Sequence, residues 1–298
     1  AIILENTGSN EVKIMETLVI MGAGQFGRAA VSLINRDFFS ILAAADQDSR
    51  LWGTSLEGIP VMSLPEAMAL KPDTLLISVS GRDRRETMKS QAEHLGFHGN
   101  IIFMDEMRRY FDIRSAVLLR LCKRLNRMEI PGSLAELGVY KGDTAWKLNL
   151  FLPHRRLYLF DTFQGFAETD IAEEKARSLS RAGAGDFSDT SEKAVMSRLP
   201  FPDQAVIRKG FFPDTASGLE HEAFALVSLD ADLYAPTLAG LEFFYPRLSP
   251  GGAIILHDWD SRRFPGAGEA VRDWEQQHGP LPLVPLGDLH GTAVIIHP

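Results

Sequence analysis

Two hydrophobic periods alternate along the first third of the chain. Short apolar runs are typical of buried strands, and they occur at residues 17–21, 41–45, 74–79 and 100–104. Between them, helical spacing occupies residues 26–35 and 84–96, and Ser63-Leu64-Pro65-Glu66 is a capping box that opens another helix. Strands that alternate with helices predict parallel βαβ units, so we expect a small Rossmann-like domain over residues 1–105.

The second half of the chain repeats this alternation after Pro131-Gly132. Strands are expected at residues 133–138, 156–160, 205–208, 223–229 and 253–257. Two further β-like runs, at residues 281–286 and 291–297, are joined by Gly287-Asp288, which is short enough for a hairpin. The pattern predicts an α/β fold with a second Rossmann-like domain over residues 133–298, whose last strand is antiparallel.

The two domains are joined by a segment, residues 106–132, with apolar side chains at helical spacing over residues 106–128. We expect one connecting helix here. Its basic residues, Arg114 among them, are interpreted as a solvated face. The alternative is that these basic residues form a stripe that binds nucleic acid. This alternative is disfavoured because the rest of the chain is acidic.

The amino-acid composition excludes or disfavours several classes of function. Of 298 residues, 45% are hydrophobic and 23% charged, as in soluble globular proteins, and 39 acidic against 31 basic residues give a net charge of −8. This balance disfavours nucleic acid or an anionic membrane as a partner. A single cysteine excludes an internal disulfide. With no signal-peptide pattern and no apolar run of roughly 18 residues, we expect a cytoplasmic enzyme, and further expect a homo-oligomer.

Each domain has a glycine-bearing loop after its first strand and an acid after its second. In the first domain these residues are Gly22, Gly24, Gly27 and Asp46. Ligands of open α/β sheets bind outside the carboxyl ends of the strands, where an acid accepts hydrogen bonds from ribose hydroxyls. The loop therefore predicts a nucleotide site.

The second domain carries a different loop, with Glu136, Gly138 and Gly142, followed 25 positions after Glu136 by Asp161. A pyrophosphate would be repelled by the acid in this loop, whereas the α-ammonium of an amino acid would be attracted. S-adenosylmethionine combines such an ammonium with a ribose. The loop chemistry therefore favours this cofactor over NAD.

Further acids follow two later strands. Asp230 and Asp232 are two positions apart and hence expected on one face, and His257-Asp258 follows the next strand. In a doubly wound sheet these ends are neighbours, so Asp230, His257 and Asp258 are candidates for one divalent cation. Such a cation would acidify an acceptor hydroxyl, and a nearby carboxylate would remove its proton.

Residues 133–298 resemble the macrocin O-methyltransferase family of S-adenosylmethionine-dependent, Mg²⁺-dependent sugar methyltransferases. The segments that carry the resemblance, in the family's order, are GSLAELGVYKGDT (132–144), LYLFDTFQGF (157–166), GDFSDTSEKAV (185–195), LDADLYAPT (229–237), YPRLSPGGAIILHDWD (245–260) and PGAGEAVRDW (265–274). The resemblance implies a class I methyltransferase sheet and methyl transfer to a hydroxyl of a sugar or glycoside.

The resemblance also implies roles for individual residues. The methionine part of the cofactor would be surrounded by the loop residues Glu136, Gly138, Tyr140, Gly142 and Thr144. The ribose would be held by Asp161, with Thr162 and Phe163 beside it, and the adenine would lie near Asp186 and Phe187. Asp230 and Asp258 would bind the metal, with Asp230 the preferred base.

One departure concerns His257, because the family has two consecutive acids where this chain has His257-Asp258. Mg²⁺ prefers oxygen ligands, and a histidine favours Mn²⁺ or a later metal. The residue is a metal ligand, a support for one, or the catalytic base. These alternatives stay open at this point.

The first domain resembles small Rossmann-like domains attached to bacterial sugar-modifying enzymes, some of which bind nucleotide sugars. The alternative is a docking or dimerising module without ligand.

Residues 168–191 are interpreted as an active-site lid loop. Two other functions remain: an NAD- or nucleotide-sugar-dependent oxidoreductase run from the first domain, which lacks a Tyr-x-x-x-Lys constellation after its loop, and a non-catalytic methyltransferase-like scaffold.

Overall fold

The structure is a computed structural model that describes residues 15–298, apart from the side chains of residues 108 and 109. The chain divides into two units, Ala1–Asp112 and Ile113–Pro298, each with its own sheet. The first 14 residues of the expected first domain lie outside the described residues.

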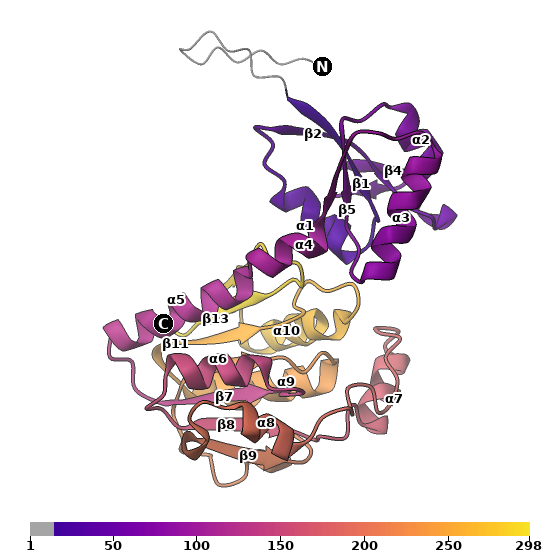
Figure 1. The fold of residues 1–298 in the computed structure, drawn as a ribbon. Coiled ribbons are helices and arrows are strands. Elements are labelled where there is room, and N and C mark those ends of the chain that lie inside the picture. The colour runs from indigo at the N-terminus through magenta and orange to yellow at the C-terminus, as the bar shows by residue number, and fades with distance from the viewer. Residues whose placement is uncertain (1–14) are drawn as a thin grey trace. The chain divides into compact units, whose positions relative to one another are not determined.

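The first unit, indigo to purple in Figure 1, is built on a six-stranded sheet with strand order β3-β4-β2-β1-β5-β6. All neighbouring strands pair in parallel except β3, which is antiparallel to β4 at one edge. The strands are β1 (Glu16–Met21), β2 (Phe39–Ala45), β3 (Ser55–Leu56), β4 (Ile59–Met62), β5 (Thr74–Ile77) and β6 (Asn100–Phe103). The helices are α1 (Gln25–Leu33), η1 (Ser49–Leu51), α2 (Leu64–Ala69), α3 (Arg82–His94) and α4 (Met104–Tyr110). The expected parallel βαβ arrangement is confirmed, as is the capping box of Ser63 and Glu66 that opens α2.

The centre of this sheet is apolar along whole strands, as expected for parallel strands covered by helices. Every residue of β5 is buried, and so are the last four of β1. In register, Met21 faces Ala45 on one side and Ile77 on the other. The chain therefore leaves β1, β2 and β5 at the same edge of the sheet.

The second unit contains a seven-stranded sheet with strand order β12-β13-β11-β10-β7-β8-β9. Its strands are β7 (Ser133–Leu137), β8 (Leu157–Asp161), β9 (Ala205–Lys209), β10 (Phe224–Leu229), β11 (Leu248–Leu256), β12 (Leu283–Pro285) and β13 (Ala293–Ile296). The pairs β11–β13 and β12–β13 are antiparallel and the others parallel, which confirms the antiparallel last strand. Because the chain moves from β7 toward β9 and then returns to β10, the strand order reverses between β7 and β10. That reversal is where ligands bind in open α/β sheets.

Helices cover both faces of this sheet (Figure 1). One apolar core joins the sheet to α5, α6 and residues of α8, and a second joins it to α9 and α10. The helices of this unit are α5 (Ile113–Arg127), α6 (Asp143–Phe151), α7 (Glu168–Ala176), α8 (Glu192–Arg198), η2 (Pro202–Gln204), η3 (Asp214–Ala216), α9 (Tyr234–Phe244), η4 (Tyr245–Arg247) and α10 (Pro265–His278). Among the described residues, we find no helix whose length and apolar character would let it cross a membrane.

Two expectations about helices are wrong. The single helix expected over residues 106–128 is two helices, because the backbone is extended at Phe111, and α5 starts after Asp112, a residue type favoured at helix N-caps. The segment 168–191 is not all loop, because its first part forms α7. Acidic side chains in the first turn, Glu168 and Asp170, favour a helix N-terminus there. Apolar spacing does not reveal a two-residue break, and α7 has few apolar side chains that could show helical spacing.

Candidate functional site

Strand register in the second unit determines which side chains meet at its carboxyl edge. Leu137 of β7 pairs with Leu229 of β10, which in turn pairs with Leu256 of β11. The residue after Leu229 is Asp230, and the residue after Leu256 is His257. The carboxyl ends of three adjacent strands therefore bring Glu136, Asp230 and His257 to one part of the sheet.

Three half-buried carboxylates gather at this edge. One oxygen from each of Asp230, Asp232 and Asp258 lies within 4.8 Å of the others, close enough to ligate one cation. Burial raises the pKa of all three carboxyls, and repulsion between them adds to this for Asp232 and for Asp258; the pKa of Asp258 is raised to about 7. The expectation that Asp230 and Asp232 share a strand face is wrong, because β10 ends at Leu229. A turn brings Asp232 back, with φ of 60°.

His257 is buried beside these acids but does not belong to the cluster of three carboxylates, which is called the carboxylate group below. Its Nδ1 lies 2.5 Å from Nη1 of Arg114 and 3.5 Å from Oδ2 of Asp230, and its Nε2 lies 3.5 Å from Oγ of Ser228. A guanidinium can only donate, so Nδ1 accepts and the ring proton is assigned to Nε2. Burial, and then the charge of Arg114, lower the pKa of His257 well below its usual value. The imidazole is therefore neutral.

Glu136 is a second buried acid, and one of its oxygens, Oε2, has no hydrogen-bond partner among the described residues. Burial raises its pKa well above the usual range, and the charges of Asp230 and Asp161 raise it further. An unpaired polar atom in a protein interior is unfavourable unless a ligand supplies the missing hydrogen-bond partner. Glu136 is thus placed to meet a cationic group at the point where the strand order reverses.

Two glycines of the loop after β7 have packing roles that the sequence did not predict. At Gly138, with φ of 86°, a Cβ would lie 1.9 Å from the carbonyl oxygen of Asp230. At Gly142, with φ of 76°, a Cβ would lie 3.0 Å from a methyl group of Val195. The glycines let the loop approach β10 and α8. Thr144, the second residue of α6, is buried.

Asp161, at the end of β8, binds the same loop through its carboxylate. Oδ2 accepts the backbone N–H groups of Val139 and Tyr140, each at 2.8 Å, and Oδ1 accepts that of Phe163 at 2.6 Å. Thr162 closes the following turn, with its hydroxyl donating to the carbonyl of Gly165 at 2.9 Å. Each carboxylate oxygen has two lone pairs, so Oδ1 keeps acceptor capacity for a ligand hydroxyl.

The irregular part of segment 168–191 folds back onto this loop. The hydroxyl of Tyr140 donates to Asp189 at 2.6 Å, and the hydroxyl of Thr190 donates to the carbonyl oxygen of Tyr140. The ring of Phe187 lies 5.1 Å from that of Tyr140, centroid to centroid, in an edge-to-face contact. Asp186 is exposed and accepts the N–H of Gly183 at 2.9 Å. Aromatic side chains therefore line the approach to the loop.

Helix α7 is attached beside the acids by a buried carboxylate. Oε1 of Glu174 accepts the N–H of Tyr234, the first residue of α9, at 2.7 Å. An apolar cluster of Ile171, Leu233 and Phe264 lies next to it. Because Leu233 directly follows Asp232, α7 is packed against the chain segment that carries the carboxylate group.

Backbone strain concentrates in the same region. Nine described residues other than glycine have positive φ, and five of them belong to this site: Tyr140, Phe163, Phe187, Asp232 and Asp258. Such conformations are unfavourable for residues with a Cβ and are retained where the surrounding structure imposes them, commonly at functional sites.

Sequence reasoning missed three contributors. Arg114 was expected on a solvated face, but it contacts the buried His257. Asp232 was not assigned to the metal, although its spacing from Asp230 was a usable signal. Glu174 carried no signal at all, since it lies in a segment interpreted as loop.

The predicted nucleotide loop of the first unit has a related construction. Asp46 accepts the N–H of Ala23 through Oδ2 at 2.7 Å. At Gly27 a Cβ would lie 2.0 Å from the carbonyl oxygen of Gly22, so this glycine lets α1 pack on the loop. At Gly24 a Cβ would meet no described atom within 4 Å.

Known proteins resemble part of this chain in both sequence and fold. A 4'-O-methyltransferase from Streptomyces olivaceus, named for 8-demethyl-8-(2,3-dimethoxy-alpha-L-rhamnosyl)-tetracenomycin-C, is 29% identical over 175 residues, or 55% of this chain and 65% of that protein. Mycinamicin III 3''-O-methyltransferase from Micromonospora griseorubida is 28% identical over 179 residues, 53% of this chain and 69% of that protein. The chain thus spans under two thirds of the length of the first relative.

The fold of the O-methyltransferase NovP matches with a TM-score of 0.51 at 22% sequence identity, over 62% of this chain and 79% of that one. This chain therefore shares its fold, and not only part of its sequence, with an O-methyltransferase. A family model described as Macrocin-O-methyltransferase (TylF) matches residues 112–295, more than half of the chain. The chain therefore belongs to the macrocin-O-methyltransferase family.

Proposed function

We propose that the second unit transfers a methyl group from S-adenosylmethionine to a hydroxyl of a sugar or glycoside. The observation that carries this proposal is the buried carboxylate of Glu136, with an unpaired oxygen at the reversal of strand order. The family match supports the reaction class. The names of the relatives, a rhamnosyl-tetracenomycin and a mycinamicin methyltransferase, support a glycoside acceptor.

The residues present fit the cofactor. S-adenosylmethionine, when bound, supplies an electrophilic methyl group on its sulfonium. Glu136 would hold the α-ammonium, because an ion pair there satisfies the unpaired oxygen and relieves the unfavourable burial of the carboxylate. Asp161 would accept the ribose hydroxyls on its remaining lone pairs, next to the loop that it already orders. Phe187, which lies against Tyr140, would border the adenine.

The residues also fit a divalent cation. Mg²⁺ takes carboxylate oxygens, and Asp230, Asp232 and Asp258 offer three within 4.8 Å. When bound, the metal would lower the pKa of the acceptor hydroxyl. We leave His257 out of this ligand set, because Arg114 already occupies the lone pair on Nδ1.

The proton of the acceptor hydroxyl would pass to Asp230. A carboxylate at the carboxyl edge of the sheet, with an elevated pKa, is a better proton acceptor than an unperturbed one. His257 then acts as a positioning residue: the imidazole is neutral, and its Nδ1 lies 3.5 Å from Oδ2 of Asp230. Helix α7 and the segment after it would keep water from the reacting groups.

The test is transfer of labelled methyl from S-adenosylmethionine to a panel of glycosides and nucleotide sugars, with and without Mg²⁺. Glu136→Gln should raise the Kd for S-adenosylmethionine about 10- to 100-fold, because a hydrogen bond to a charged group is lost. Glu222→Gln is the matched control, since Glu222 binds the hydroxyl of Ser133 at the opposite end of β7. Labelled glycoside supports the proposal. A panel without labelled product, from protein that binds the cofactor, overturns it in favour of a non-catalytic scaffold.

A further inference from the structure

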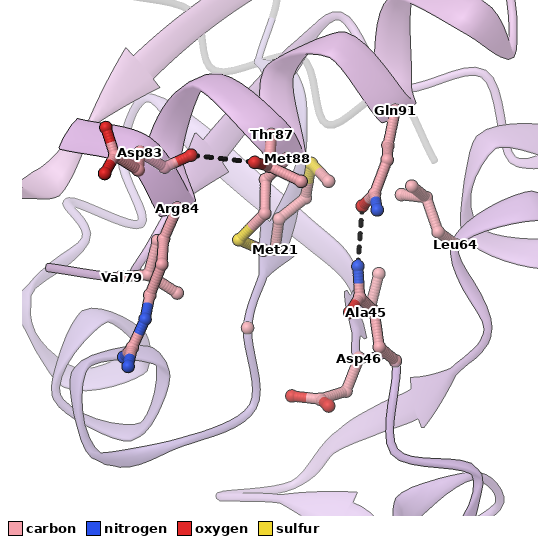
Figure 2. Close-up of a pocket in the computed structure, with 12 residues that line it drawn as sticks. Met21, Ala45, Asp46, Leu64, Val79, Asp83, Arg84, Thr87, Met88 and Gln91 are labelled. Atoms are coloured by element: carbon pink, nitrogen blue, oxygen red, sulfur yellow. Dashed lines mark hydrogen bonds between the residues drawn. The ribbon is translucent and has the colours of Figure 1, made fainter. Parts of the chain in front are cut away.

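The first unit contains a cavity that methyl transfer does not require. It has a volume of about 420 Å³, within the range of small-molecule sites, and opens at the carboxyl ends of β1, β2 and β5 (Figure 2). Gly22, Asp46 and Val79 line it, each one or two residues beyond the end of a strand. With β2, β1 and β5 adjacent and parallel, this edge is where an open α/β sheet binds its ligand.

The walls of the cavity are apolar and its rim is polar. Met21, Leu64 and Met88 are among the apolar lining residues, and thioethers and branched aliphatic groups form surfaces that suit a flat ring. At the rim, Nε2 of Gln47 donates to Oε1 of Gln91 at 2.7 Å, linking the end of β2 to α3. Each amide retains further donor or acceptor capacity beyond this bond, which suits the polar edge of a heterocycle.

Asp46 supplies the charge that such a ligand would meet. Its Oδ2 accepts the N–H of Ala23 at 2.7 Å and its Oδ1 accepts that of Asp48 at 2.9 Å, so the carboxylate is held in place before any ligand arrives. Each oxygen has a second lone pair, and two acceptors on one rigid group match the two hydroxyls of a ribose. The same charge would repel a phosphate on the 2′-oxygen.

One side of the cavity offers a cation to a phosphate. Arg84 and Asp83 both line the cavity, and Figure 2 places them on the side away from Asp46 and Gln91, so a phosphate there would meet the cation of Arg84 beside the acid Asp83. The loop at Gly24 is open, since a Cβ there would meet no described atom within 4 Å. The carboxylate of Asp46 and the guanidinium of Arg84 lie at different ends of the cavity, as the diol and the phosphate of one nucleotide would require.

We propose that this cavity binds a ribonucleoside diphosphate group with a free 2′,3′-diol, with the diol on Asp46, the base against the apolar walls and the phosphate toward Arg84. Two kinds of molecule carry this group: dinucleotide cofactors such as NAD⁺ and ribonucleotide sugars such as UDP-glucose. The site is independent of the methyltransferase site, because all its lining residues belong to the first unit.

The test is calorimetric titration of the full chain with NAD⁺, NADP⁺, ADP, 2′-deoxy-ADP and UDP-glucose, in saturating S-adenosylhomocysteine to occupy the second unit. We expect NAD⁺ or UDP-glucose to bind, and the stronger of the two to identify the source of the group. ADP should bind at least tenfold more tightly than 2′-deoxy-ADP, because the deoxy form lacks the 2′-hydroxyl that would bind Asp46. NAD⁺ should bind more tightly than NADP⁺, because Asp46 repels the 2′-phosphate.

Variants tie the binding to this cavity. Asp46→Asn should weaken binding about tenfold and Met88→Trp, which fills the cavity, should abolish it, while methyl transfer stays unchanged. Asp48→Asn is the matched control, since Asp48 follows the same strand but does not line the cavity. Thermal unfolding verifies that each variant folds, and Met88→Trp keeps the test valid if Asp46→Asn disturbs the loop. The proposal is overturned if no ribonucleotide binds at millimolar concentration, if the 2′-deoxy form binds equally well, or if neither variant weakens binding.

Discussion

Nη1 of Arg114 lies 2.5 Å from Nδ1 of His257, which places a charged donor from the first turn of α5 on a buried imidazole at the carboxyl edge of the sheet. The contact assigns the ring proton to Nε2 and keeps the imidazole neutral beside Asp230. Residues 143 positions apart in the chain thus determine the setting of the proposed base.

Removal of Arg114 should therefore lower the rate more than the affinity. We expect Arg114→Ala to reduce kcat about 10- to 100-fold with little change in KM for S-adenosylmethionine, the usual effect of losing a group that orients a reacting residue. Arg114→Lys should restore part of the loss and show a shifted pH–rate profile. Steady-state kinetics of both variants provide the measurement.

The matched control is Arg124→Ala. Arg124 lies on the same helix and donates to the carbonyl of Gly251 at 2.6 Å, so it contributes packing without contact to His257. Equal losses of kcat in the Arg114 and Arg124 variants would mean that Arg114 acts only through the stability of α5.

The carboxylate group of Asp230, Asp232 and Asp258 leads to a prediction about metal. Chelation should abolish methyl transfer and Mg²⁺ should restore it. Asp232→Asn should weaken binding of Mn²⁺, measured by calorimetry, at least tenfold, since one of three anionic ligands is lost. Asp260→Asn, two positions beyond Asp258 and outside the group, should bind Mn²⁺ as the unaltered protein does. Full activity after chelation would exclude the metal role.

Much of this site could be predicted because parallel strands end at one edge. The apolar runs locate β10 and β11 closely enough to predict that Asp230, His257 and Asp258 are neighbours. Register is dictated by burial on both faces of the sheet, so the residues that follow paired strand ends must lie side by side.

The missed features depend on information that periodicity does not contain. Asp232 reaches the group through a left-handed backbone turn, and Arg114 reaches His257 across a helix–sheet contact. Local spacing encodes neither the turn nor the helix–sheet contact, although the two-residue spacing of Asp232 from Asp230 was a usable signal. The break at Phe111 between α4 and α5 was missed for a related reason, because two residues outside the helices barely disturb the apolar spacing.

Gly138 gives a prediction about stability. A Cβ at this position would lie 1.9 Å from the carbonyl oxygen of Asp230, and its φ of 86° is unfavourable for any other residue. Gly138→Ala should lower the free energy of unfolding by about 2–4 kcal/mol, from steric overlap together with backbone strain. Urea unfolding measures the change.

Gly185→Ala separates the two causes. Gly185 has a similar φ of 80°, but a Cβ there would meet no described atom within 4 Å. Strain alone should lower its free energy of unfolding by about 1–2 kcal/mol. If the two variants were equally destabilised, close packing against Asp230 would not be the reason for a glycine at 138.

Asp170 predicts how stability depends on pH. It is buried in the first turn of α7, and burial, with the charges of Glu173 and Glu174, raises its pKa from 3.8 to about 6. The folded state therefore holds a proton that the unfolded chain releases. This contribution to stability is complete below pH 3.8 and is lost as pH rises through about 6.

Asp170→Asn should unfold with the same free energy as the unaltered protein near pH 4 and be more stable by about 1–3 kcal/mol near pH 8. The exposed Glu168→Gln, in the same turn, should show no such crossover, and parallel stability curves for Asp170→Asn and the unaltered protein between pH 4 and pH 8 would contradict the raised pKa.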